Sequence, residues 1–197
     1  MRVPMCVPPV TEEMIQAAAD ALRNERLVLG ESVFRFEEAF ARYIGTKEAV
    51  SVSSGTTALS LALLGLGLKG EVITTPFSFI ATANSIVHAG GTCRFADVRE
   101  EDYLIDPREV EGAVNDDSRV IMPVHLYGHP CRMDRLAEIA ESKGLDIVED
   151  AAQAHGAVFK GSRVGSLGRA GCFSFYPTKN MTVGGDGGMV TTDDQEL

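Results

Sequence analysis

The stretch at residues 172–188, CFSFYPTKNMTVGGDGG, places a lysine where its amine could react with a carbonyl compound. The apolar and aromatic residues 172–176 predict a strand, and Pro177 ends it because proline lacks the amide donor of a strand ladder. Lys179 follows this break, and Ser174 lies five positions before it. An amine must lose its proton to form a Schiff base, and burial favours that loss. A lysine in a loop is more often a solvated surface charge, so this position needs support from other stretches.

Two further stretches contain groups that suit a phosphate and a flat ring. In SSGTTAL, Gly55 permits close approach of the backbone, and Thr56 and Thr57 offer hydroxyls at the start of a predicted helix, whose amides attract an anion. The same pattern is also typical of a plain helix N-cap. In TPFSFIATAN, Phe77 and Phe79 follow a strand, where a flat cofactor ring would stack on one of them or both would pack in the core.

Asp150 ends a run of residues that predicts a buried apolar strand. An unpaired carboxylate is costly there, so Asp150 needs a cationic or hydrogen-bonding partner, such as a protonated pyridine nitrogen. Gln153 faces the same side if a helical turn begins after the strand. Capping of a short helix is the alternative role for Asp150, and His155 is expected to pack or to cap.

The elements that position these residues alternate between strands and helices. This alternation indicates an α/β domain with a mostly parallel sheet of about seven strands, flanked by helices. Two earlier helices are predicted, one from Thr11 to Leu22 and one from a cap at Ser32 to Tyr43. We therefore expect an N-terminal helical segment (1–47) and a cofactor-binding large domain (48–197). Strands are predicted at 49–53, 71–75, 92–96, 119–123, 145–149, 171–175 and 188–192, and the intervening helices at 58–66, 78–89, 106–114 and 133–142.

Ligands of such sheets bind at the carboxyl ends of the strands, where all of these candidate groups lie. One rim would then hold an anion site, a stacking ring, a carboxylate for a ring nitrogen and an amine for an aldehyde. Pyridoxal 5'-phosphate requires these four groups together. The sequence therefore predicts a site for this cofactor.

Composition and charge exclude several classes of protein. The 197 residues are 45% hydrophobic and 23% charged, which is ordinary for a globular domain, and the net charge of -10 disfavours nucleic acid and anionic membranes as partners. No run of apolar residues has the length of a secretion signal or a membrane span. The four cysteines form no CxxC pair, which indicates free thiols in a reducing, cytoplasmic compartment. They are Cys6, Cys93, Cys131 and Cys172.

Two other kinds of site are disfavoured. His125 and His129 have the spacing of one helical face, but VHLYGHP predicts a strand and a turn, and no third metal ligand lies near them in the sequence. No GxGxxG follows a predicted strand, so a Rossmann dinucleotide site is not expected. We expect no metal.

Several motifs together resemble the DegT/DnrJ/StrS family of nucleotide-sugar aminotransferases. They are RLVLGESVFRFEEAFARYIG, SSGTTAL, TPFSFIATAN, VHLYGHP, EDAAQAHGA and SFYPTKNMTVGGDGG, and they cover nearly the whole chain in order. The resemblance implies the aspartate aminotransferase-like fold (fold type I) and a pyridoxal-phosphate-dependent reaction. An amino group would move, with glutamate as the donor, to a nucleotide-linked keto-sugar.

The resemblance also implies roles for single residues. Lys179 matches the Schiff-base lysine and Asp150 the partner of the pyridine nitrogen. Related sugar dehydratases have a histidine at the position of Lys179, so the chain resembles the transaminating branch. Gln153 matches the glutamine beside the cofactor ring. The remaining positions that match cofactor-binding residues are Gly55, Thr56 and Thr57 in the phosphate-binding turn, Phe79 as the stacking ring, and Ser174 as a phosphate ligand.

The chain departs from the family in length. It stops after the last predicted strand of the large domain, so we expect the smaller C-terminal domain and part of the substrate site to be absent. In the family the active site lies at a subunit interface, which implies a homodimer. The alternative is a truncated, catalytically incompetent member of the same fold, or a regulatory or partner-binding one.

Overall fold

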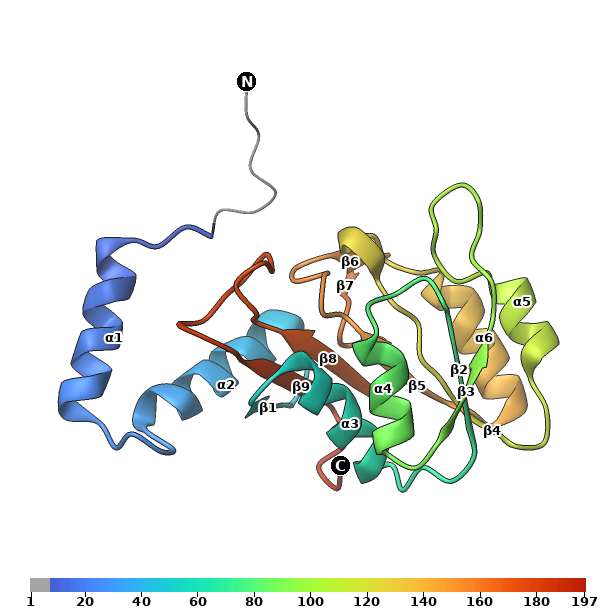
Figure 1. Cartoon of the computed structure of the whole chain (residues 1–197), viewed down its shortest axis with the longest axis horizontal. Coiled ribbons are helices and arrows are strands. Elements are labelled where there is room, and N and C mark those ends of the chain that lie inside the picture. Colours follow the sequence, from blue (N-terminus) through green and yellow to red (C-terminus); the bar gives the residue numbers. More distant parts are fainter. Residues whose placement is uncertain (1–7) are drawn as a thin grey trace.

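A seven-stranded sheet forms the centre of the structure, a computed structural model that describes residues 8–197 (Figure 1). Cys6 and Pro4 lie outside the described residues. The strands are β1 Glu48–Val52, β2 Glu71–Thr74, β3 Thr92–Phe95, β4 Ser118–Ile121, β5 Asp146–Asp150, β8 Ala170–Ser174 and β9 Gly188–Thr192. Their order across the sheet is β1-β9-β8-β5-β4-β2-β3, and every neighbouring pair is parallel except the two that involve β9. The predicted mostly parallel seven-stranded sheet is confirmed.

Successive strand residues point to opposite faces of this sheet, and each face is covered by its own helices. Val72 and Val148 pack with α3 and α4, whereas Ile73 and Ile147 pack with α5 and α6. Phe173 on the second face packs against α2. The result is three layers, with the helices α2 Glu31–Ile44, α3 Gly55–Gly65, α4 Ala81–His88, α5 Pro107–Ala113 and α6 Met133–Lys143.

The two N-terminal helices behave differently from each other. The helix α1, Glu12–Asn24, is capped as predicted by Thr11, whose side chain accepts a hydrogen bond from the Met14 amide. It has no buried residue and stands apart from the sheet (Figure 1). The predicted cap of α2 is wrong, because Gly30 occupies that position. The Ser32 hydroxyl instead donates to the carboxylate of Glu25, which binds the first turn of α2 from outside.

Other differences from the expected elements are local. The helix predicted from residue 58 begins three residues earlier, at Gly55, and α4 starts three residues later than predicted. Sequence patterns did not predict a hairpin of two-residue strands, because such short strands show no periodicity. The hairpin consists of β6 Val158–Phe159 and β7 Ser162–Arg163. No helix turn follows β5; its exit is a series of turns. Within residues 8–197, no helix is long and apolar enough to cross a membrane.

Candidate active site

A cavity of about 400 Å³ lies where β5 and β8 end and α3 begins. It brings together groups from five separate segments of the chain. Thr57 is the one predicted site residue that does not reach the cavity. The predicted residues that line it are Gly55, Thr56, Phe79, Asp150, Gln153, Ser174 and Lys179.

The first turn of α3 forms one wall of this cavity. The Ser54 side chain caps the helix by accepting from the Thr57 amide at 3.1 Å, and the Thr57 hydroxyl lies 3.0 Å from that of Ser54. The amides of Gly55 and Thr56 precede the first intrahelical hydrogen bonds, and such amides attract anions. Thr57 therefore contacts the capping residue Ser54, while Gly55 and Thr56 line the cavity.

Two glycines allow the strands to approach this turn. A β-carbon on Gly55 would lie 2.6 Å from the β-carbon of Ser174, which is closer than real side chains come. A β-carbon on Gly188 would overlap the backbone of Ser54. Because glycine has no side chain at these two positions, β8 and β9 can approach the first turn of α3, and the hydroxyl of Ser174 lies beside that turn.

Asp150 contributes a buried carboxylate at the end of β5. The Thr82 hydroxyl donates to its Oδ2 at 2.7 Å, and the Ala152 amide donates to its Oδ1 at 3.2 Å. Burial raises the pKa of the Asp150 carboxyl above its usual range, although these two hydrogen bonds and the nearby Lys179 charge act in the opposite direction. This carboxylate is therefore held without a fully neutralising partner, beside an open cavity.

Lys179 lies on the loop after β8 and faces the same cavity. Its backbone amide donates to the Tyr176 carbonyl at 2.8 Å, which closes a turn immediately after the strand. Ser174, at the end of β8, is buried. The amine and the Asp150 carboxylate thus come from two neighbouring parallel strands, at the end of the sheet where ligands bind.

Gln153 and Phe79 complete the lining. The amide of Tyr127, a residue with a φ of 54°, donates to Oε1 of Gln153 at 3.0 Å, which leaves the Nε2 donor for the cavity. Phe79 is 68% exposed and lines the cavity, whereas Phe77 packs against Tyr103 at a ring-centroid distance of 5.7 Å. Of the two phenylalanines, only Phe79 can stack on a ring bound there.

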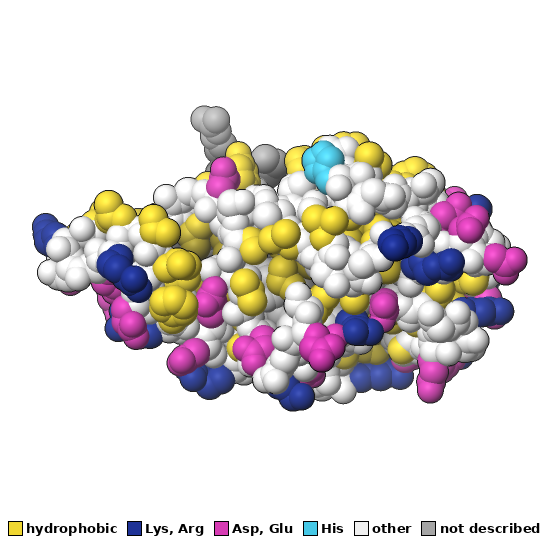
Figure 2. Space-filling model, turned by 90° about the horizontal axis from the view of Figure 1, so that it is seen from below, with side chains coloured by type: hydrophobic (Ala, Val, Ile, Leu, Met, Phe, Trp, Pro, Cys, Tyr) yellow, Lys and Arg dark blue, Asp and Glu magenta, His cyan; other side chains and the backbone are white. Residues whose placement is uncertain are grey.

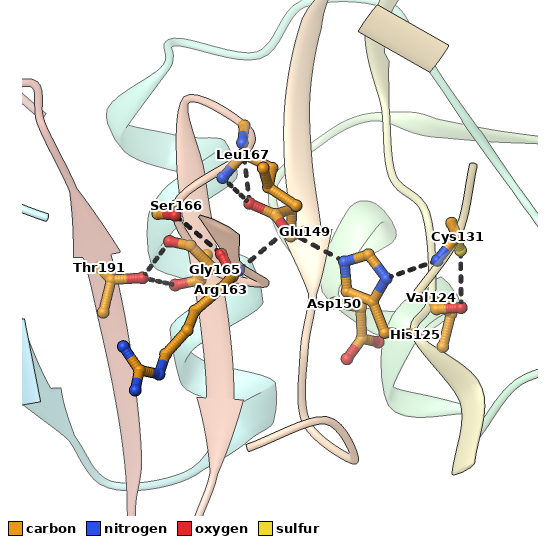
Figure 3. A network of polar contacts seen from close by, with 12 residues as sticks. Val124, His125, Cys131, Glu149, Asp150, Arg163, Gly165, Ser166, Leu167 and Thr191 are labelled. Carbon is orange, nitrogen blue, oxygen red and sulfur yellow. Dashed lines mark hydrogen bonds and ion pairs between the residues drawn. The ribbon is translucent and has the colours of Figure 1, made fainter. Parts of the chain in front are cut away.

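A buried polar network lies on the other face of β5, next to Asp150 (Figure 3). The Glu149 carboxylate accepts hydrogen bonds from the backbone amides of Gly165, Leu167 and Gly168 at 2.7 to 2.8 Å. It also contacts Nε2 of His125 at 3.0 Å. A charged group can be buried when hydrogen bonds satisfy it, so Glu149 joins β5 to the loop between β7 and β8.

His125 extends this network toward the segment after β4 (Figure 3). Its Nδ1 accepts from the Cys131 amide at 3.0 Å, so the ring proton lies on Nε2 and points at Glu149. Both nitrogens are engaged, which leaves neither for a metal with His129. Among residues 8–197, no three His, Cys, Asp or Glu side chains form a group that could hold a metal ion. The hydrogen bonds of Glu149 and His125 fix the position of β5, the strand that ends at Asp150.

His155 packs, which is one of the two roles expected for it. Its ring lies against Phe173 and Phe175, at centroid distances of 5.4 and 5.6 Å. Burial lowers the pKa of this imidazole to about 4. His155 is therefore neutral near pH 7 and belongs to the core beneath the site.

Sequence reasoning missed two hydroxyls of the site, Ser78 and Thr82. Both line the cavity, and their side-chain oxygens lie 2.7 Å apart. The four-residue spacing of two hydroxyls directly after a strand was the available signal. It did not reveal the partner, because Asp150 lies 68 positions further along the chain.

The sheet order, the three layers and the cavity at the strand ends define an α/β protein of the aminotransferase type. The chain belongs to the DegT/DnrJ/EryC1/StrS aminotransferase family, which it matches over residues 8–197. The predicted family and fold class are thereby confirmed.

Individual relatives agree with this assignment. The chain is 44% identical to a dTDP-3-amino-3,4,6-trideoxy-alpha-D-glucose transaminase of Streptomyces venezuelae, over 100% of this chain and 54% of the relative. It is 43% identical to a pleiotropic regulatory protein of Geobacillus stearothermophilus, over 94% and 50%. An aminotransferase from Psychrobacter cryohalolentis superimposes with a TM-score of 0.92 at 40% identity, over 96% and 49%. The chain thus spans about half the length of the proteins it matches.

Proposed function

We propose that this chain is the cofactor-binding part of a pyridoxal-phosphate-dependent aminotransferase that acts on nucleotide-linked keto-sugars, with glutamate as the amino donor. The observation that carries the proposal is the meeting of Lys179 and Asp150 in one cavity beside the first turn of α3. Membership of the family supports the reaction type, and the nucleotide-sugar transaminase among the relatives supports the substrate class. The glutamate donor rests on the family resemblance.

The residues of the cavity fit the cofactor. The glycine-lined contact between α3 and β8 leaves the first amides of α3, which have no intrahelical acceptor, and the Ser174 hydroxyl beside the cavity for a phosphate. Asp150 is a buried carboxylate that suits a protonated ring nitrogen, and Phe79 offers a face for stacking. Gln153 presents a donor for an oxygen on the ring.

The bound cofactor would supply an electron sink for a carbanion on the substrate. Lys179 would bind the cofactor aldehyde through Nζ and, once released, take a proton from the α-carbon of the amino donor and return it as a general acid. Asp150 would hold a proton on the ring nitrogen through its negative charge. Gln153 and Phe79 would hold the ring in a fixed orientation relative to Lys179.

A non-catalytic, partner-binding role is the second candidate. It is favoured by the regulatory name of one relative. The two candidates differ in turnover, because a regulatory protein needs no proton transfer at Lys179.

The test adds pyridoxal phosphate to the 197-residue chain, followed by glutamate and a panel of nucleotide keto-sugars. We expect a spectrum of bound cofactor that changes when glutamate is added, together with a small yield of aminated sugar, detected by mass spectrometry, from one member of the panel. Cofactor binding with no response to glutamate would favour the partner-binding candidate. Absence of cofactor binding by a folded sample would refute the proposal.

We further propose a homodimer, with α1 and the segment after it in the contact. Leu22 lies on α1, which has no buried residue, and is 70% exposed, and Val28 in the segment after α1 is 76% exposed. Figure 2 shows hydrophobic side chains gathered at the end of the molecule where α1 lies. Large exposed apolar patches mark interfaces, and subunit contacts at the active site are implied by the family resemblance.

Light scattering of the double variant Leu22→Asp/Val28→Asp tests this contact. We expect the wild-type chain to have the mass of a dimer and the variant that of a monomer with unchanged circular dichroism, because buried charges oppose the contact. The matched control is Val87→Asp, which changes an exposed apolar residue on α4 and should leave the dimer intact. A monomeric wild-type chain, or a dimer that survives the double substitution, would contradict the proposal.

A further inference from the structure

Asp150 accepts a hydrogen bond from a side chain of α4, and no sequence motif predicts this pair. Thr82, on α4, is 2% exposed, and its Oγ1 donates to Oδ2 of Asp150 at 2.7 Å. The hydroxyl of Ser78 lies 2.7 Å from the same Oγ1. A hydroxyl has one hydrogen, and that of Thr82 is used on Asp150, so Ser78 must donate to Thr82. The hydrogen bonds therefore run in one direction, from Ser78 through Thr82 to Asp150.

We propose that Thr82 is the positioning residue of Asp150, with Ser78 orienting its hydroxyl, so that the carboxylate faces the ring nitrogen of the cofactor. This inference rests on the proposed function for the identity of that cofactor. The hydrogen-bond chain itself is a property of the protein alone, and it can be tested without the cofactor.

The physical reason lies in the burial of Asp150. A buried carboxylate needs hydrogen-bond donors, and only the Thr82 hydroxyl and the Ala152 amide donate to it among the described residues. The Ala152 bond is the longer of the two, at 3.2 Å. Loss of the Thr82 donor would therefore leave Oδ2 without a partner and free the carboxylate to rotate.

Three titratable side chains on the packed elements face Asp150. Lys179, after β8, favours its ionised form. His125, after β4, has both ring nitrogens engaged, by the Cys131 amide and by Glu149. Cys172 on β8 is kept as a thiol by burial and by the carboxylate itself. None of the three donates a hydrogen bond to the carboxylate. Their influence is therefore the same in all of the variants below.

The first experiment titrates Asp150 by NMR in the cofactor-free chain. Thr82→Val keeps the shape of the side chain but removes the donor, so we expect the pKa of Asp150 to rise further. Thr82→Ser keeps the donor and should restore the wild-type titration. The matched control is Thr74→Val, because Thr74 is equally buried but donates to the Met122 carbonyl. An Asp150 titration that is the same in Thr82→Val and in the wild type would overturn the proposal.

The second experiment measures cofactor affinity and the pH profile of the loaded chain. With Thr82→Val we expect the affinity for pyridoxal phosphate to fall about tenfold or more, because a hydrogen bond to a charged group is lost. The acidic limb of its turnover profile should move to higher pH, since Asp150 must be ionised to hold a proton on the ring nitrogen. Thr82→Ser should recover both. If Thr82→Val does not fold, Ser78→Ala replaces it, and an unchanged titration and affinity would then contradict the proposal.

The two experiments separate this inference from the proposed function. If the wild-type chain binds no pyridoxal phosphate, the proposed function fails, while the cofactor-free titration still decides the role of Thr82. If the wild-type chain binds the cofactor but Thr82→Val behaves like Thr74→Val in both experiments, the role of Thr82 fails alone.

Discussion

Replacing Lys179 with alanine should abolish covalent capture of pyridoxal phosphate and lower turnover by about 10²-fold or more, the usual contribution of a general base. The reason is positional, because Lys179 is the lysine that lines the cavity beside Asp150 and the first turn of α3. The measurement is reduction with borohydride in the presence of the cofactor, followed by peptide mapping. In the wild-type chain the label should lie on Lys179.

The control for this experiment is Lys69→Ala, an exposed lysine in the loop before β2. It should keep the full label on Lys179 and the spectrum of the wild type. A label on another lysine, or an undiminished label in Lys179→Ala, would show that the amine has been assigned to the wrong residue. The experiment needs no sugar substrate, so it tests the role of Lys179 independently of the proposed substrate class.

Replacing Asp150 with asparagine should lower turnover by about 10²-fold or more, while cofactor binding falls much less. Asparagine keeps the size of the side chain, and its Oδ1 can still accept from the Thr82 hydroxyl. It loses the negative charge that would hold a proton on the ring nitrogen. The ratio of turnover to cofactor affinity therefore measures the charge of Asp150 rather than its shape.

The stability of Asp150→Asn independently tests whether ionisation of Asp150 destabilises the folded chain. Burial raises the pKa of Asp150, so the native state binds this proton more tightly than the unfolded state, and ionisation costs stability as pH rises through that range. The cofactor-free variant should therefore be at least as stable as the wild type at neutral pH.

Asp146→Asn, at the solvent end of β5 in an ion pair with Arg169, is the matched control and should turn over normally. Near-normal turnover of Asp150→Asn would show that the charge of Asp150 is not needed to hold a proton on the ring nitrogen.

Local pattern was sufficient for most of the elements. Short apolar runs predicted the seven strands within a residue or two, and Thr11 was identified as a cap, because strand patterning and capping depend on neighbours in the chain. Where two local signals competed, prediction failed. Ser32 is a good capping residue, but Gly30 is the N-cap of α2, and the Ser32 hydroxyl donates to the carboxylate of Glu25 at the end of α1.

The sequence by itself determined the family, the α/β class and the candidate residues Lys179, Asp150 and Gln153, because each lies in a motif that is contiguous in the chain. Only the tertiary structure decided which side chains meet. It placed Phe77 against Tyr103, left Thr57 outside the cavity, and joined Thr82 to Asp150. The physical reason is that strand order and the alternation of faces bring α4 against β5, and these contacts between distant segments have no signature in local sequence.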